Sequence, residues 1–415
     1  MTHPDAVVVV GGGLAGHTAV ATLRSCGYQG RITMVTREPE APYDRPPLSK
    51  ELLSDASFEP ALNPRLDYLD VDLRTATAAV GIRRGEVLTE TGSVPFDAAV
   101  LAPGLRARRL PAGPGAPPAR VLRTLDDAVR LRAELVPGRN VLIAGAGLIG
   151  AEVATAAAAA GCRVAVVGPE FGPALDAAPA AVLDAVRGWY GERGVELTIG
   201  TRVLETTPAG VLLSDTGFRP ADVVVAAIGG EPATSWLRGM QVVLDPAGFI
   251  STDEYLRTPL PGVYAAGDAV AWRSSRYGVD MHLEHWHHAA ESAQVAARNI
   301  LGSAETYDPL PYFWSHQLGH SLHYVGRHDP GDTADISPAE TGTAGNSTAG
   351  NGTAGNSTAG NGTARNGTDA RSGWSVTWTR GGRPTAVLAI DAPHLVRRAR
   401  KVLDAATQPE LGAAR

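Results

Sequence analysis

Short apolar runs alternate with helix-like segments through the first 300 residues of the chain. Residues 6–10 are apolar throughout and end at glycine, which predicts a buried parallel strand. A helix-like segment follows at 14–26, and a second strand is expected at 31–36. This alternation of strand and helix indicates an α/β chain built on parallel sheets. The same order returns at 140–144, 148–160 and 163–167.

Both strand–helix units carry a glycine-rich fingerprint where the first strand turns into the helix. The first unit reads VVVVGGGLAG and the second reads VLIAGAGLIG. Glycines at these spacings permit a tight turn, let the backbone approach a pyrophosphate, and let helix and strand pack closely. The helix N-terminus then faces the phosphates. Two dinucleotide sites on one chain suggest that electrons pass from one bound dinucleotide to another. The glycines are Gly11, Gly13, Gly16, Gly145, Gly147 and Gly150.

Further apolar runs close each unit and bring the chain back to the first one. The runs at 97–102 and 222–228 stand at matching places and are followed by glycine. The stretch TPLPGVYAAGDA ends at Asp268 and precedes a helix-like segment at 285–301. A flavin domain needs an acid near the ribityl chain, so we assign this stretch to the first unit. We therefore expect an FAD-binding domain of residues 1–112 and 247–303, with an NAD(P)-binding domain of residues 113–246 inserted into it.

The pattern changes from about residue 304. YFWSHQ, SLHYVGR, WSVTWTR and TAVLAI read as antiparallel strands, and HLVRRARKVLDA reads as a closing helix. We expect a C-terminal α+β interface domain at 304–409. Within it, the TAGN(S/G) repeat has no large apolar residue, which predicts a disordered insertion at 337–372, on the tip of a β-hairpin flanked by GDTADIS and GWSVTW. The whole fold is then α/β, with two Rossmann-like domains and a C-terminal domain bearing an antiparallel sheet.

Composition narrows the class of protein. The net charge of -6 does not favour nucleic-acid binding. The chain has no apolar run of 18 residues, so no membrane span is predicted. The first strand begins almost at the first residue, so we expect no leader and a soluble cytoplasmic protein. The only cysteines, Cys26 and Cys162, form no CxxC pair, which excludes a local redox dithiol. Both are expected to be small buried fillers, and we expect no metal site at the histidines of HLEHWHH.

Charged residues near the fingerprints supply the candidate chemistry. By spacing, the position of the acid that meets the adenosine ribose falls on Thr36, and Glu38, just beyond it, is the candidate. Arg45, in PYDRPPLSKELL, could neutralise a pyrophosphate. Lys50 is one of only two lysines against 35 arginines, which points to a task that arginine does not perform. In the second unit the acid position is Gly168, and Glu170 could replace the missing acid. Its charge would repel a 2′-phosphate, which favours NADH, with NADPH possible.

In this order, GGGLAG, PYDRPPLSK, GAGLIGAE, VYAAGDA, EHW and YFWSxQ resemble the oxygenase-coupled NADH-dependent ferredoxin reductases. That group includes putidaredoxin, rubredoxin and biphenyl-dioxygenase-type reductases and is similar to apoptosis-inducing factor. The resemblance implies FAD at the first and third motifs and NAD at the second. It also implies a catalytic Lys50–Glu152 pair near the flavin N5 and the nicotinamide, with Trp286 beside the flavin pyrimidine. Further cofactor-binding candidates are Leu14, Ala15, Ala79, Ala102, Gly104, Arg106, Leu148, Ile149 and Gly229.

The chain departs from that family pattern at a few positions, which bear on NAD affinity more than on FAD binding. LATG becomes LAPG with Pro103, and Glu231 stands where arginine is common. YFWSDQ becomes YFWSHQ with His316, and the acid at Gly168 is lost.

The expected function is an FAD-dependent NAD(P)H:ferredoxin reductase that serves a monooxygenase or dioxygenase. Its partner would be a small acidic iron–sulfur ferredoxin, with Arg108, Arg109, Arg397, Arg398 and Arg400 as candidate contacts, and the protein would be a monomer or homodimer. Two alternatives stay open. One is an NADH oxidase or apoptosis-inducing-factor-like flavoprotein without a ferredoxin partner. The other is a non-catalytic flavoprotein with a decayed NAD site.

Overall fold

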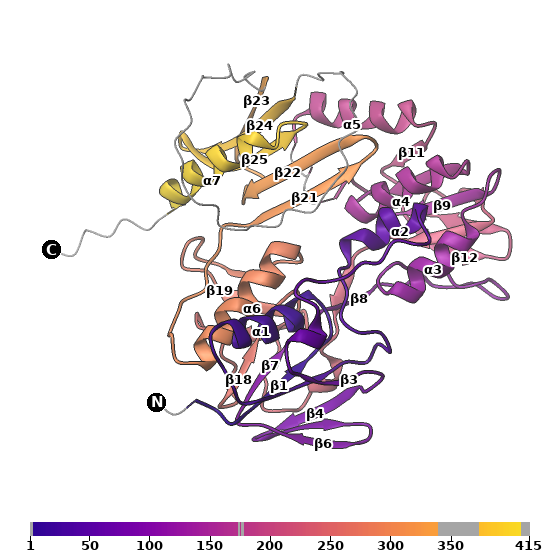
Figure 1. Cartoon of the computed structure of the whole chain (residues 1–415). Helices are drawn as coiled ribbons and strands as arrows, with labels where there is room; N and C mark the ends of the chain where they lie inside the picture. The colour runs from indigo at the N-terminus through magenta and orange to yellow at the C-terminus, as the bar shows by residue number, and fades with distance from the viewer. Residues whose placement is uncertain (1–2, 173–174, 176–177, 339–372, 408–415) are drawn as a thin grey trace, which may run out of the picture.

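The computed structural model describes residues 3–172, 175, 178–338 and 373–407. It has the expected α/β architecture, with two parallel sheets and an antiparallel sheet near the C-terminus (Figure 1). Among the described residues, no helix combines the length and apolar character needed to cross a membrane.

The first parallel sheet has the strand order β18-β7-β1-β2-β3. Strand β18 pairs with β7, so the chain returns to this sheet after building the second one, as the sequence predicted. Helices α1 and α6 lie side by side against the sheet (Figure 1). Every residue of β1 is buried, which is why its sequence is an unbroken apolar run. The elements are β1 (Ala6–Val10), α1 (Leu14–Ser25), β2 (Arg31–Val35), β3 (Asp72–Arg74), β7 (Ala98–Leu101), β18 (Val263–Ala265) and α6 (Trp286–Ile300).

The second parallel sheet has the order β11-β10-β9-β15 and repeats the plan of the first. Helix α3 begins with a capping box, in which Thr124 and Asp127 each bond the other's backbone N–H. Its elements are α3 (Leu125–Glu134), β9 (Asn140–Ala144), α4 (Leu148–Ala159), β10 (Arg163–Gly168), α5 (Ala180–Glu192), β11 (Glu196–Ile199) and β15 (Val223–Ala226). An antiparallel sheet beside it holds β12 (Val203–Thr207), β13 (Gly210–Leu213) and β14 (Phe218–Pro220).

The C-terminal antiparallel sheet has the order β21-β22-β25-β24-β23, and α7 packs on β25 and β22. The four predicted strands and the closing helix are confirmed. The flank GDTADIS forms β23, which contains residues 337 and 338, so the expected insertion begins at least two residues too early. The rest of that insertion, 339–372, lies outside the described residues. The bounds are β21 (Tyr312–Gln317), β22 (His320–Gly326), β23 (Thr333–Pro338), β24 (Trp374–Arg380), β25 (Arg383–Ile390) and α7 (His394–Thr407).

Several short elements carry no periodic signal in the sequence and were missed. They are η1 (Pro46–Ser49), η2 (Leu66–Tyr68), β4 (Ala79–Arg83), β5 (Glu86–Thr89), β6 (Gly92–Pro95), β8 (Leu105–Ala107), β16 (Gly230–Pro232), η3 (Ser235–Leu237), β17 (Ile250–Thr252), β19 (Val270–Arg273) and β20 (Asp280–His282). The short helix α2 (Glu51–Ser54) begins directly after Lys50. Strands of three to five residues are too short for apolar alternation to stand out from loop sequence.

The apolar core falls into two large clusters. One surrounds the first sheet and its two helices. The other joins the second sheet to the C-terminal sheet, since Ile143 of β9 and Trp378 of β24 both belong to it, together with Leu48 of the PYDRPPLSKELL segment. The expectation for the cysteines was wrong, because Cys26 is exposed and Cys162 is half-buried. The exact domain boundaries stay predictions.

Candidate functional site

A cavity of about 610 Å³ opens where the first fingerprint, the PYDRPPLSKELL segment, α4, α6 and β21 converge. It brings together most of the predicted site residues, although they come from distant parts of the chain. Those that line it are Gly11, Gly13, Leu14, Ala15, Glu38, Arg45, Lys50, Ala79, Ala102, Gly104, Arg106, Leu148, Ile149, Glu152, Asp268 and Trp286. Those that do not are Gly16, Gly145, Gly147, Gly150, Glu170 and Gly229.

The glycines of the first fingerprint have different structural roles. Gly11 has φ +120°, and a Cβ there would lie 2.0 Å from the carbonyl oxygen of Ala102. At Gly16 a Cβ would lie 1.9 Å from the carbonyl oxygen of Gly11, so both glycines are required by packing. At Gly13 a Cβ would meet only the end of the Arg45 side chain, at 3.9 Å. Gly13 therefore faces the cavity, and the bare backbone there fits the close approach of a dinucleotide pyrophosphate.

Glu38 and Arg45 form an ion pair at the cavity wall, with 2.6 Å between Oε1 and Nη2. The Tyr43 hydroxyl donates a hydrogen bond to the second oxygen of Glu38 and accepts one from the backbone N–H of Leu125 at 2.9 Å. Burial raises the pKa of Tyr43. Arg45 also donates to the carbonyl oxygen of Arg123 at 2.5 Å. The predicted ribose acid and the predicted phosphate partner are thus linked to each other and to the start of α3.

Lys50 and Glu152, placed 102 residues apart in sequence, form an ion pair of 2.9 Å. Glu152 lies one turn into α4 and is only 4% exposed, although a glutamate in a helix is more often on the surface. Two serine hydroxyls also donate to it, from Ser49 and from Ser315, each at 2.5 Å. The pair implied by the family resemblance is therefore formed, and no pattern in the sequence indicated its serine partners.

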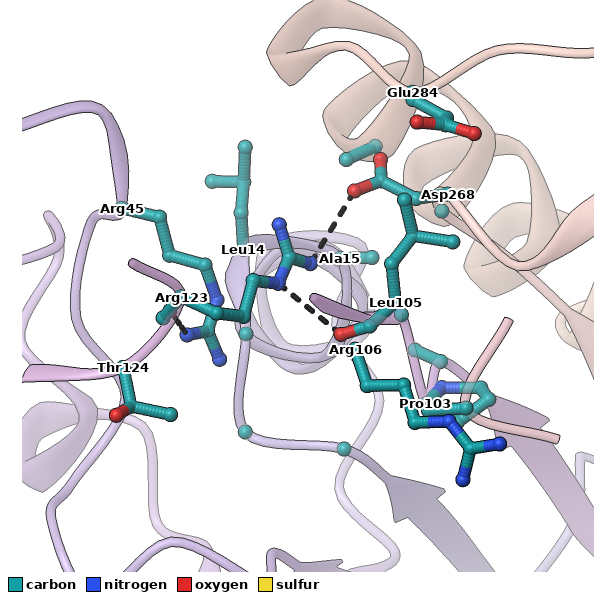
Figure 2. A pocket seen from close by; sticks show the side chains of 18 of the residues that line it. Leu14, Ala15, Arg45, Pro103, Leu105, Arg106, Arg123, Thr124, Asp268 and Glu284 are labelled. Carbon is teal, nitrogen blue, oxygen red and sulfur yellow. Dashed lines mark hydrogen bonds and ion pairs between the residues drawn. The ribbon is translucent and has the colours of Figure 1, made fainter. Parts of the chain in front are cut away.

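Arg123 was missed by sequence reasoning and lies near the middle of the site (Figure 2). Its guanidinium donates to the Leu105 carbonyl oxygen at 3.1 Å and pairs with Asp268 at 3.5 Å. Burial lowers its pKa, and the neighbouring Arg45 acts in the same direction. Glu284 stands beside Asp268 in Figure 2, and burial, then the Asp268 charge, raises its pKa.

The N-terminus of α6 closes another side of the cavity. Trp286 donates from its indole N–H to Asp44 at 2.9 Å, and burial raises the pKa of Asp44. Burial lowers the pKa of His285 to about 4. His288 uses both ring nitrogens on protein partners, the Tyr307 hydroxyl at 2.6 Å and the Gly267 carbonyl oxygen at 3.1 Å. Within the described residues, no group of three or more His, Cys, Asp or Glu side chains is arranged to hold a metal ion.

The second fingerprint repeats the geometry of the first. A Cβ at Gly145 would lie 2.2 Å from the Ala227 carbonyl oxygen, one at Gly150 would lie 2.0 Å from the Gly145 carbonyl oxygen, and one at Gly147 would meet nothing within 4 Å. The absence of an acid at Gly168 has a physical explanation. A Cβ at Gly168 would lie 2.9 Å from the backbone nitrogen of Ala146, so this backbone leaves no room for a carboxylate. Glu170 is exposed two residues beyond the end of β10.

Of the other departures from the family pattern, one lines the cavity and two do not. Pro103 lines it. Glu231 forms an ion pair with Arg106 at 2.7 Å, and both side chains are about half exposed. This pair spans the short β8–β16 sheet, which links the two nucleotide units. His316 is exposed on β21, with its ring 5.6 Å from the ring of Trp314. The residues present thus fit a dinucleotide at the first fingerprint and leave the second site without the usual ribose acid.

The chain belongs to the pyridine nucleotide-disulphide oxidoreductase family, whose model matches residues 5–293. It is 34% identical over 333 residues to the ferredoxin–NAD(+) reductase component of the p-cumate 2,3-dioxygenase system of Pseudomonas putida, covering 77% of this chain and 81% of that protein. The crystal structure of Fdr9 matches with a TM-score of 0.83 and 38% identity, covering 98% and 96% of the two chains. The covalent putidaredoxin reductase–putidaredoxin complex matches with a TM-score of 0.80 and 27% identity, over 97% and 93%. The protein is thus an oxidoreductase of this family.

Proposed function

We propose that the protein is an FAD-dependent ferredoxin reductase that takes hydride equivalents from NADH and delivers single electrons to a small iron–sulfur protein. The carrying observation is the Lys50–Glu152 pair, which stands in a cavity reached by both nucleotide units. When bound, the two nucleotide cofactors supply the hydride and one-electron chemistry. The relatives, named as reductase components of oxygenase systems, favour this function over the alternatives without a ferredoxin partner.

The first fingerprint and its neighbours would hold FAD. Gly13 and the N-terminus of α1 would take the pyrophosphate, with Arg45 and Arg123 supplying positive charge nearby. Asp268 would meet the ribityl chain, and Trp286 would lie beside the flavin pyrimidine. Lys50 would place its ammonium near the flavin N5.

The N-terminus of α4 would face the NADH pyrophosphate, with Leu148 and Ile149 lining the shared cavity. Since Gly168 has no room for a side chain, Glu170 would be the acidic group nearest the adenosine ribose. Its charge favours NADH over NADPH.

The electron acceptor would be a small acidic ferredoxin that docks on a basic face. Arg397, Arg398 and Lys401 are exposed on α7, and the Arg400 guanidinium lies 5.2 Å from the ring centroid of Tyr312, which lines the cavity. Arg109 also lines the cavity. The terminal oxygenase, the monomer or homodimer state and the cytoplasmic location stay predictions.

Two measurements test the function. In an anaerobic titration, NADH should bleach the flavin absorbance of the purified protein. Cytochrome c reduction should then become fast only after an iron–sulfur protein of an oxygenase system is added. A flavin that NADH leaves oxidised would contradict the reductase function, and cytochrome reduction that is equally fast without the iron–sulfur protein would contradict the ferredoxin partner.

A further inference from the structure

The carboxylate of Glu152 accepts hydrogen bonds from two other segments that lie far away in the sequence. Ser49 and Lys50 both donate to Oε2, at 2.5 Å and 2.9 Å. Ser315, on β21 of the C-terminal sheet and 163 residues away, donates to Oε1 at 2.5 Å. Glu152 therefore joins the PYDRPPLSKELL segment, the second nucleotide unit and the C-terminal sheet at one point.

Burial makes these donors matter. Glu152 is 4% exposed, Ser49 is 2% and Ser315 is 1%, so water has almost no access to the carboxylate. A buried charge is destabilising unless its lone pairs are satisfied by donors. Ser315 is the donor that the structure gives to Oε1, and its loss would leave that oxygen unsatisfied or make the carboxylate turn towards other partners.

The orientation of Glu152 determines where the Lys50 ammonium lies. Besides Glu152, Lys50 donates to the Pro46 carbonyl oxygen at 3.3 Å, and its ammonium lies 5.4 Å from the ring centroid of Trp314. An ammonium has three N–H donors, so these two hydrogen bonds leave one for a group bound in the cavity that Lys50 lines. A turned carboxylate would move the ammonium with it.

We propose that Ser315 is a positioning residue for Lys50, acting through the carboxylate of Glu152. Ser315 holds Oε1, so that Oε2 stays directed at Ser49 and Lys50. The proposal rests on the proposed function, in which Lys50 stands near the flavin N5. It gives the C-terminal sheet a part in flavin reduction. Neighbouring side chains on a strand point to opposite faces, so only alternate residues of β21 can face α4. Ser315 is buried against α4, and the next residue, His316, is exposed.

The test is a double-mutant cycle on the flavin-loaded protein. The rate of flavin bleaching by NADH is measured by anaerobic stopped flow for Ser315→Ala, Lys50→Ala and the double variant. Ser315→Ala should slow bleaching about tenfold in the wild-type background, since hydrogen bonds to charged groups are the stronger ones. In the Lys50→Ala background the same change should alter the rate less than about twofold. Ser315→Thr keeps the hydroxyl and should restore most of the rate.

A matched control is Ser375→Ala, which removes a buried serine from β24, three strands away in the same sheet. It should leave bleaching unchanged. Equal slowing by Ser315→Ala in both backgrounds would overturn the proposal, because it would show an effect that does not pass through Lys50.

Thermal unfolding gives a readout that does not depend on NADH. Ser315→Ala should lower the Tm of the flavin-loaded protein in the wild-type background and change it much less in a Glu152→Ala background, where the hydroxyl has lost its acceptor. Equal Tm losses in both backgrounds would overturn the proposed link to Glu152. If NADH reduced none of the variants, including wild type, the proposed function would fail, and the Tm cycle would still decide whether Ser315 acts on Glu152.

Discussion

A few single residues decide the chemistry of the cavity, either through a charged side chain or through the absence of a side chain. Lys50 is the clearest case. Its compact ammonium pairs with a buried carboxylate, and replacing it with arginine would alter the geometry of that ion pair. Gly13 is the opposite case, since its value lies in the side chain it lacks.

Replacing Lys50 tests the electrostatic role of its ammonium. Lys50→Ala should slow flavin reduction by NADH by roughly 10- to 100-fold, about 1.4 to 2.7 kcal/mol of barrier, because a cation near N5 stabilises charge that develops on the reduced ring. FAD affinity, measured by flavin fluorescence, should change much less. Lys50→Arg is the sharper comparison. We expect flavin reduction to remain slow in this variant, because a planar guanidinium does not reproduce the compact charge of an ammonium. Unchanged stopped-flow traces would remove Lys50 from the mechanism.

Replacing Gly13 tests the cofactor cradle apart from folding. Gly13→Leu should give a folded protein without bound FAD, because the added side chain projects into the cavity and meets only Arg45. Circular dichroism measures whether the variant folds, and flavin absorbance measures whether it binds FAD. Gly188→Leu, at an exposed position of α5, is the control and should stay yellow. A yellow Gly13→Leu protein would show that the pyrophosphate passes elsewhere.

The two strand–helix–strand elements share a plan but differ at the end of their second strand. In the first, Glu38 is present and paired with Arg45. In the second, the matching residue is Glu170, which is exposed in the turn beyond β10. Gly168, which matches Thr36 of the first unit, packs too closely on Ala146 for an acid to stand there. The selectivity between NADH and NADPH is therefore expected to depend on this turn.

Reversing the charge of that turn should change the preferred coenzyme. Glu170→Arg should raise the ratio of kcat/KM for NADPH over NADH by roughly tenfold, about 1.4 kcal/mol, because a repulsive carboxylate is replaced by a phosphate-binding fork. Glu192→Arg makes the same charge change at the exposed end of α5 and should leave the ratio near its wild-type value. Equal ratios in the two variants would place the adenosine ribose away from Glu170.

On the scale of the whole molecule, elements of both nucleotide units and of the C-terminal sheet line one cavity. The second nucleotide sheet and the C-terminal sheet share a hydrophobic cluster, while the first sheet has its own. Helix α7 is tied to the β19–β20 region through Arg276 and Asp404 at 3.0 Å. Its exposed basic side chains therefore lie at a fixed place relative to the cavity.

The salt dependence of turnover tests docking at α7. Raising the salt concentration from about 10 mM to about 1 M shortens the Debye length from about 30 Å to about 3 Å, so steering between charged proteins is lost. Ferredoxin-dependent turnover should fall sharply across this range, while ferricyanide reduction by NADH should barely change.

Charge reversal locates the docking face. Arg397→Glu with Lys401→Glu should lower turnover with the ferredoxin severalfold at low salt. Arg84→Glu, in the turn between β4 and β5, should not. If both activities respond alike to salt, or if the α7 variant keeps full ferredoxin turnover, the partner docks elsewhere or is not acidic.

The sequence by itself determined the strand and helix order, the two fingerprints, the return of the chain to the first sheet, and the family. The fingerprints and the strand and helix order are local features, because glycine spacing and apolar periodicity follow from turn geometry and burial within about 30 residues. The return to the first sheet was inferred from the flavin-type stretch that ends at Asp268. It failed at short strands such as β8 and β16, and at Cys26 and Cys162, whose burial depends on neighbours distant in sequence.

Only the tertiary structure decided what surrounds each chemical group. Arg123 enters the cavity because the start of α3 is held against Tyr43 and Arg45, and no pattern in its own segment indicates that contact. Ser315 reaches Glu152 across 163 residues, and Gly168 excludes an acid only because Ala146 packs against it. Such contacts arise from the packing of whole elements, and their energies depend on burial that no single segment of sequence contains.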